Sequence, residues 1–197
     1  MQGICLTCNK NDTCEDAKRN LNMLECTKKN ETMLSKIYCG IDPGNTDSAI
    51  AVMNDKYELL QFCKLENKEM LQHIGSLLLA ESVETAAIEM LASYGMSVGK
   101  SVFETCVWVG RFTQHINFYG VKVDYIYRMD EKMNLCHNSR AKDANIRQAL
   151  IDRFATFDFK NGRGTKDNRD FFYGVSKDVW AAIAVCVTYM DKVKERA

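Results

Sequence analysis

Three acidic residues stand where apolar neighbours make a carboxylate costly. Asp42 ends an apolar run before Pro43-Gly44, Glu89 lies inside the apolar segment 85–91, and Asp178 begins an apolar helical pattern. A carboxylate in such surroundings needs a cation or a metal ion as its partner. Three converging carboxylates are typical of a Mg²⁺ site, because Mg²⁺ prefers oxygen ligands. Two such ions about 4 Å apart can activate water and stabilise the leaving oxygen in phosphodiester cleavage.

Each acid also has a structural interpretation when it is taken singly. Asp42 before Pro-Gly can be a turn aspartate that binds its own backbone. Asp178 can favour the helix dipole from the first turn of a helix. Glu89 is harder to explain in this way, because an acid at the fifth position of a seven-residue apolar strand needs a buried partner.

The elements that must position these acids follow from apolar spacing and turn residues. Alternating or continuous apolar runs predict strands, and three- and four-residue spacing predicts helices. The expected strands are 36–42, 48–53, 57–64, 85–91 and 121–127, and the expected helices follow caps at Asn67, Ser139 and Ser176 or span 100–119. This order predicts an α/β fold with a mixed five-stranded sheet and helices on both faces. If the first and fourth strands are neighbours, Asp42 and Glu89 meet at one edge, and a helix start can bring Asp178 there.

Composition limits the class of protein. The chain has 197 residues, 46% hydrophobic and 26% charged, which suits one globular domain, 36–197, with a short extension, 1–35. No apolar run approaches the roughly 18 residues of a membrane span, and the first thirty residues lack the apolar segment of a secretory signal. Nine cysteines, an odd number, fit reduced thiols. We therefore expect a cytoplasmic protein with no membrane partner.

The charge is zero overall but is unevenly distributed. Residues 132–177 carry ten basic and five acidic residues, whereas residues 36–131 carry eight basic and thirteen acidic ones. Segregation of this kind fits a one-sided surface for a polyanion, although an ordinary solvated surface explains it as well.

The extension contains four cysteines in the pattern C-x2-C-x5-C-x11-C, namely Cys5, Cys8, Cys14 and Cys26. Four thiolates can form a closed tetrahedral Zn²⁺ site. The second pair lacks the close spacing of a zinc knuckle, so a thiol-rich extension without metal is the alternative.

Four segments in order carry a resemblance to a known family: GIDPGNTDSAIAV, AIEML, RAKDANIRQALIDRF and SKDVWAAIAV. Together they resemble the RuvC-like Holliday junction resolvases, most closely the bacteriophage versions, over about residues 36–195. The resemblance implies an RNase H-like fold, a homodimer, and symmetric nicking of four-way DNA junctions with Mg²⁺ or Mn²⁺. If the chain is encoded by a phage, it acts in the host cytoplasm.

The resemblance also assigns roles to particular residues. Asp42 resembles the metal ligand of the first strand, Glu89 that of the fourth strand, and Asp178 that of the last helix. Lys142 stands where the family has a basic residue near the scissile phosphate.

The chain departs from the family at one place. Many relatives carry two metal-binding residues a helical turn apart at the last helix, but the residues three before and three after Asp178 are Val175 and Ala181. Either three acids suffice, or Asp143 or another acid supplies a fourth ligand, or the second metal site is weaker, or the chain is a non-catalytic relative.

Several further residues are candidates for contacts with DNA. Arg140, Lys142, Lys166 and Lys177 can bind phosphates without reading sequence, although Lys142 alone also fits a solvated residue in a first helical turn. Tyr94 can stack on an unpaired base. Phe103 and Trp108 are expected in the helix core, and 162–174 is expected to be a mobile loop beside the site.

Two other functions compete with a nuclease. The segment GIDPGNTDSAIAV also resembles the first phosphate loop of actin- and Hsp70-like ATPases, but the chain has no second lobe or second glycine-rich loop. A branched-DNA-binding protein without cleavage is the stronger rival because of Val175 and Ala181. Metal-dependent strand cleavage separates it from the nuclease.

Overall fold

The structure, a computed structural model, describes residues 35–93, 95 and 97–196. The predicted zinc ligands and the predicted stacking residue lie outside the described residues: Cys5, Cys8, Cys14, Cys26 and Tyr94. The division of the chain at residue 35 stays a prediction, and we describe the domain from residue 36 onward by itself.

The centre of the domain is a mixed five-stranded sheet, as the sequence predicted, and its strand order is β3-β2-β1-β4-β5. Its strands are β1 (Ile37–Asp42), β2 (Asp47–Asn54), β3 (Leu59–Glu66), β4 (Val83–Met90) and β5 (Lys122–Tyr127). The first three strands form an antiparallel meander, whereas β4 runs parallel to β1 and β5 runs parallel to β4. The carboxyl ends of β1, β4 and β5 therefore lie at one edge.

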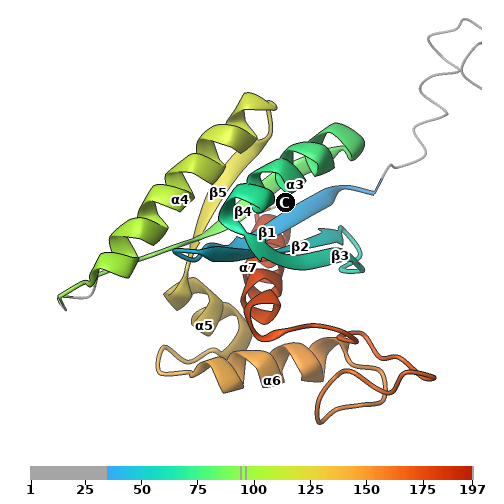
Figure 1. Ribbon diagram of the computed structural model, residues 1–197. Helices are drawn as coiled ribbons and strands as arrows, with labels where there is room; N and C mark the ends of the chain where they lie inside the picture. The colour runs from blue at the N-terminus through green and yellow to red at the C-terminus, as the bar shows by residue number, and fades with distance from the viewer. Residues whose placement is uncertain (1–34, 94, 96, 197) are drawn as a thin grey trace, which may run out of the picture. The chain divides into compact units, whose positions relative to one another are not determined.

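Helices cover both faces of the sheet (Figure 1). One face packs against α3 (Asn67–Ala80) and α4 (Lys100–Phe118), and the other packs against α7 (Lys177–Glu195). Beside α7 lie α5 (Arg128–Cys136) and α6 (Asp143–Phe154). Because side chains alternate along a strand, each face has its own core, with Cys39 and Ile41 on the α3 face and Tyr38 on the α7 face. No helix in the described ranges has the length and apolarity needed to cross a membrane.

A glycine on β1 sets the distance between the sheet and α7. A Cβ atom at Gly40 would lie 2.2 Å from the carbonyl oxygen of Ala182 and 2.6 Å from the Cβ of Cys186. Only glycine permits this approach, because the nearer obstacle is backbone and cannot move aside. The close packing aligns the start of α7 with the end of β1, where Asp178 and Asp42 lie.

The structure corrects the sequence interpretation between β5 and α6. Residues 128–136 form a helix, α5, that apolar spacing did not predict, because its sequence RMDEKMNLC has a low apolar content. Asp130 stabilises its start by accepting a hydrogen bond of 2.9 Å from the amide of Tyr127. The next helix begins at Asp143 with Lys142 as its N-cap, so the predicted start at 140 behind a Ser139 cap is wrong.

Three smaller expectations also change. Phe103 is 62% exposed rather than part of the helix core, whereas Trp108 packs against the α3 and α4 core as expected. Asn67 is the first residue of α3 and not its cap. The segment 162–174, which was expected to be a mobile loop, is instead attached to the preceding segment. The Asp170 carboxylate accepts hydrogen bonds from the backbone amides of residues 156–158.

Candidate metal and DNA site

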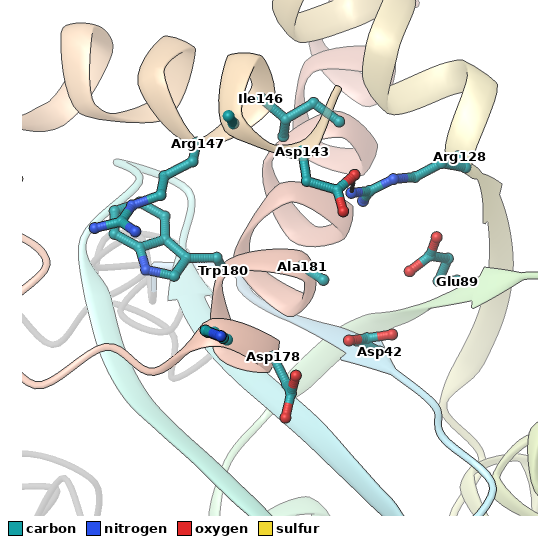
Figure 2. Close-up of a pocket in the computed structure, with 11 residues that line it drawn as sticks. Asp42, Glu89, Arg128, Asp143, Ile146, Arg147, Asp178, Trp180 and Ala181 are labelled. Atoms are coloured by element: carbon teal, nitrogen blue, oxygen red, sulfur yellow. Dashed lines mark hydrogen bonds and ion pairs between the residues drawn. The ribbon is translucent and has the colours of Figure 1, made fainter. Parts of the chain in front are cut away.

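Two of the predicted acids end neighbouring parallel strands. The register of β1 and β4 pairs Ile41 with Ile88, so the residues that follow, Asp42 and Glu89, lie side by side at the carboxyl edge. Both carboxylates point into one pocket (Figure 2). The parallel pairing that the sequence left conditional therefore brings the two acids together.

The turn after Asp42 is held rigidly. The amide of Gly44 donates to Ser48 Oγ at 3.1 Å, Ser48 Oγ donates to Asn67 Oδ1 at 2.5 Å, and Asn67 Nδ2 donates back to the Gly44 carbonyl at 3.0 Å. Ser48 and Asn67 are both buried. A closed polar network of this kind fixes the backbone where β1 ends, and so fixes the direction of the Asp42 side chain.

Asp178, the third predicted acid, lines the same pocket from the first turn of α7. It forms an ion pair of 2.7 Å with Lys64 of β3, which also lies 3.4 Å from Asp47. Among the described residues, no group of three metal-binding side chains is close enough to hold an ion. Asp178 faces Lys64 instead of the other two acids.

Burial and mutual repulsion perturb the two neighbouring acids. Burial raises the pKa of Asp42 to about 8, helped by the charge of Glu89, a hydrogen bond with it, and the charge of Asp178, and opposed by the charge of Arg128. Burial also raises the pKa of Glu89, while the charge of Arg128 and the hydrogen bond with Asp42 lower it. Two buried carboxylates with too little positive charge nearby are poised to bind a cation.

The pocket has a volume of about 630 Å³ and two chemically different walls. One wall carries Asp42 and Glu89, and the other carries Arg147 and Trp180 (Figure 2). Lys177 also lines the pocket. The Arg147 guanidinium lies 4.8 Å from the centre of the Trp180 ring, in cation–π contact. The first residues of both α6 and α7 line the pocket, and helix N-termini attract anions. The pocket thus offers a cation site beside an anion site.

The structure separates the predicted phosphate-binding residues. Lys177 lines the pocket, and Lys142 is exposed at the N-cap of α6 next to the pocket residue Asp143. Arg140 and Lys166 are exposed but do not line the pocket. These two residues stay candidates for contacts with more distant parts of a substrate.

The structure also places the three residues that bear on a fourth metal ligand, Val175, Ala181 and Asp143. Val175 is 1% exposed, and Ala181 lines the pocket without a polar atom on its side chain. Asp143 lines the pocket but forms an ion pair of 2.5 Å with Arg128.

The sequence interpretation missed several residues of the site, among them Arg128, Glu131, Arg147 and Trp180. Arg128 follows β5 directly and lines the pocket. Glu131 lies one helical turn later, is 0% exposed, and pairs with Arg128. The sequence contained a partial signal for Arg128, because this residue directly follows the predicted strand 121–127. That strand ends at the same edge of the sheet as Asp42 and Glu89.

Comparison with known proteins bears on the fold. No protein-family model matches the chain, and no curated protein is significantly similar to it. The structure is similar to that of Thermus thermophilus RuvC in complex with a Holliday junction substrate, with a TM-score of 0.62 and 15% identity, over 82% of this chain and 96% of that one. The chain has a RuvC-like fold. A second T. thermophilus RuvC structure matches with a TM-score of 0.57 and 15% identity, over 81% of this chain and 96% of that one.

The RuvC-like fold confirms the predicted architecture, whereas the bacteriophage subtype stays a prediction. Two of the residues present suit a divalent metal ion, since Asp42 and Glu89 offer desolvated oxygen ligands. Asp178, whose side chain is 46% exposed, would complete the set by leaving Lys64.

Proposed function

We propose that this chain is a metal-dependent endodeoxyribonuclease that resolves Holliday junctions or related branched DNA by phosphodiester hydrolysis. The observation that carries the proposal is a pair of buried carboxylates, Asp42 and Glu89, in a pocket whose other wall is cationic and aromatic. The acid pair requires a cation, and the opposite wall favours an anion. A phosphodiester together with a divalent ion satisfies both demands. The similarity to a RuvC bound to a Holliday junction substrate supports this choice of substrate class.

Asp42, Glu89 and Asp178 are the residues that would hold Mg²⁺ or Mn²⁺. When bound, such an ion activates water for attack and stabilises the charge that develops on the phosphate. Asp178 would exchange Lys64 for the ion, because their pair is solvent-exposed and therefore weak.

The cationic wall has a separate task, which is to bind and orient the phosphodiester. Lys177 and Arg147 present their charges at the pocket, and the N-termini of α6 and α7 add amide groups. Trp180 holds Arg147 in place through the cation–π contact. Lys142, at the N-cap of α6, is in position to meet the next phosphate along the strand.

Contacts farther from the pocket would recognise the shape of the junction. Arg140 and Lys166, both exposed, are suited to phosphate contacts that do not read sequence. Cutting two opposed strands of a symmetric junction requires two equivalent sites, so the active form would be a homodimer.

The experiment that tests the proposal is cleavage of a labelled synthetic four-way junction in Mg²⁺ and in Mn²⁺. The parent chain is compared with Asp42→Asn and with Asp124→Asn, a matched control whose carboxylate pairs with Lys122 outside the pocket. Paired nicks from the parent and the control, absent with Asp42→Asn, are the expected result. A linear duplex of the same sequence should stay uncut.

A second candidate is a branched-DNA-binding protein that does not cut. Two observations favour it: Val175 and Ala181 offer no ligand, and the described acids do not form a ready three-ligand group. The same experiment decides, because tight junction binding without nicks in either metal would select this candidate.

A further inference from the structure

An arginine occupies the pocket on the side of Glu89. Arg128, the first residue of α5, reaches from the end of β5 to the start of α6 (Figure 2). Its Nη1 donates to Glu131 Oε2 at 2.6 Å, and its Nη2 donates to Asp143 Oδ1 at 2.5 Å. The two guanidinium nitrogens thus have different partners, and these partners differ greatly in exposure.

Glu131 is the buried partner of this arginine. The residue is 0% exposed, and its second carboxylate oxygen, Oε1, is buried without a hydrogen-bond partner in the described part of the chain. A buried carboxylate that lost its single ion pair would be severely destabilising. The Nη1 bond is therefore expected to persist throughout the function of the site.

Asp143, by contrast, is a partner that Arg128 can exchange. Its side chain is 85% exposed, so it can turn to water at little cost. A phosphate oxygen entering the pocket can then accept the Nη2 donor in place of Asp143. Guanidinium groups favour such planar, charge-assisted bonds to phosphate.

The charge of Arg128 also reaches the acid pair. It lowers the pKa of both Glu89 and Asp42 against the effect of their burial. Arg128 pairs with Asp143, one of two further acids near the ligand set. The other, Asp47, lies beside Lys64 on the Asp178 side of the site. With Val175 and Ala181 apolar, a second metal ion would have few ligands beside Arg128.

We infer that Arg128 is a catalytic residue that takes the place of a second metal ion, contacting the phosphodiester through Nη2, with Glu131 as the residue that positions it. The inference rests on the proposed function, which it deepens. The protein then binds one divalent ion per chain, held by Asp42, Glu89 and Asp178. The second positive charge of the centre is part of the polypeptide.

The first test is Mn²⁺ titration of the full chain by calorimetry, which requires no cleavage. We expect one ion per chain for the parent. Arg128→Met should bind a second ion, because Glu89, Glu131 and Asp143 lose their shared cation. The double variant Arg128→Met/Glu131→Gln should return to one ion, and it leaves no unpaired buried charge to destabilise the fold.

The second test is single-turnover cleavage of the four-way junction. Arg128→Met should cut about 100-fold more slowly or worse, as expected when one charged donor to a transition state is removed. Arg128→Lys should recover only part of this lost rate. A lysine ammonium lacks the planar pair of nitrogens with which the guanidinium can bind Glu131 and the phosphate at the same time. Arg111→Met, the same substitution on exposed α4 outside the pocket, should cut at the parent rate.

The outcomes separate the inference from the function on which it rests. Two ions on the parent, or an Arg128→Met variant that cuts within about threefold of the parent rate, would overturn the role of Arg128 and leave the nuclease intact. A parent chain that binds no ion and cuts no junction would contradict both the role of Arg128 and the proposed nuclease function. One ion on the parent with slow cutting by Arg128→Met would support both.

Discussion

The carboxylates at the two ends of α7 differ in how well hydrogen bonds and positive charges around them satisfy their charge. Near its C-terminal end, Asp191 accepts hydrogen bonds from Tyr57 at 2.5 Å, from Asn134 at 2.8 Å, and from both terminal nitrogens of Arg153 at 2.7 and 2.8 Å. At its N-terminal end, Asp178 pairs with Lys64 and lines the same pocket as Asp42 and Glu89, two acids that burial has left short of partners.

The pKa values record this difference. Burial alone would raise the pKa of Asp191, but its bonds to Arg153, Tyr57 and Asn134 lower it, whereas the pKa of Asp42 rises to about 8. A satisfied acid stabilises the fold, and an unsatisfied one destabilises it until a cation arrives. The comparison identifies the N-terminal end of α7 as the functional end.

The largest expected effect concerns the unsatisfied end. Glu89→Gln should reduce junction cleavage by about 1,000-fold or more, since a metal ion contributes several kcal/mol to the transition state. It should leave the free energy of unfolding of the metal-free protein unchanged or higher, because a buried charge is removed. Single-turnover rates and urea unfolding measure the two quantities. A Glu89→Gln variant that keeps its activity but loses stability would contradict the assignment of function to the N-terminal end of α7.

At the satisfied end, Asp191→Asn should show the opposite pattern. The loss of the carboxylate weakens its bonds to Arg153 and Tyr57, and we expect the free energy of unfolding to fall by about 2 kcal/mol. Cleavage per folded molecule should stay at the parent level. Urea unfolding, with active-site titration of the folded fraction, provides the measurement. A loss of cleavage without a loss of stability would show that this end is functional too.

The pH dependence of stability sharpens the same contrast. Because the pKa of Asp42 in the folded state is raised, its contribution is most favourable when it is protonated, and stability is lost as the pH rises from about 4 towards 8. In chelator, the parent should lose about 3–4 kcal/mol relative to Asp42→Asn between pH 5 and pH 8, at about 1.4 kcal/mol for each pH unit. Parallel curves for the two proteins would contradict the raised pKa.

The smallest expected effect comes from Lys64. Lys64→Met removes the cation that holds Asp178 at 2.7 Å, so this acid becomes free for the metal ion. Because the pair is solvent-exposed, the gain in Mn²⁺ affinity should be only about threefold. Calorimetry measures it, with Lys36→Met as the matched control, since Lys36 pairs with Glu84 away from the pocket. Weaker Mn²⁺ binding would show that Lys64 supports the site instead of competing for it.

The sequence by itself determined the strands, most of the helices, and the positions of Asp42, Glu89 and Asp178 within them. These features depend on local apolar spacing and turn residues, which each segment carries independently of the rest. The same spacing missed α5, because its nine residues have little apolar content and its helix depends on packing against α6 and α7.

Only the tertiary structure decided which charges meet. Lys64 reaches Asp178 because β3 ends and α7 begins at the same edge, and Arg128 joins Glu131 to Asp143 because α5 packs against α6. An ion pair between distant segments leaves no periodic trace in the sequence, since it requires only that two side chains be placed within a few ångströms by the packing of everything between them.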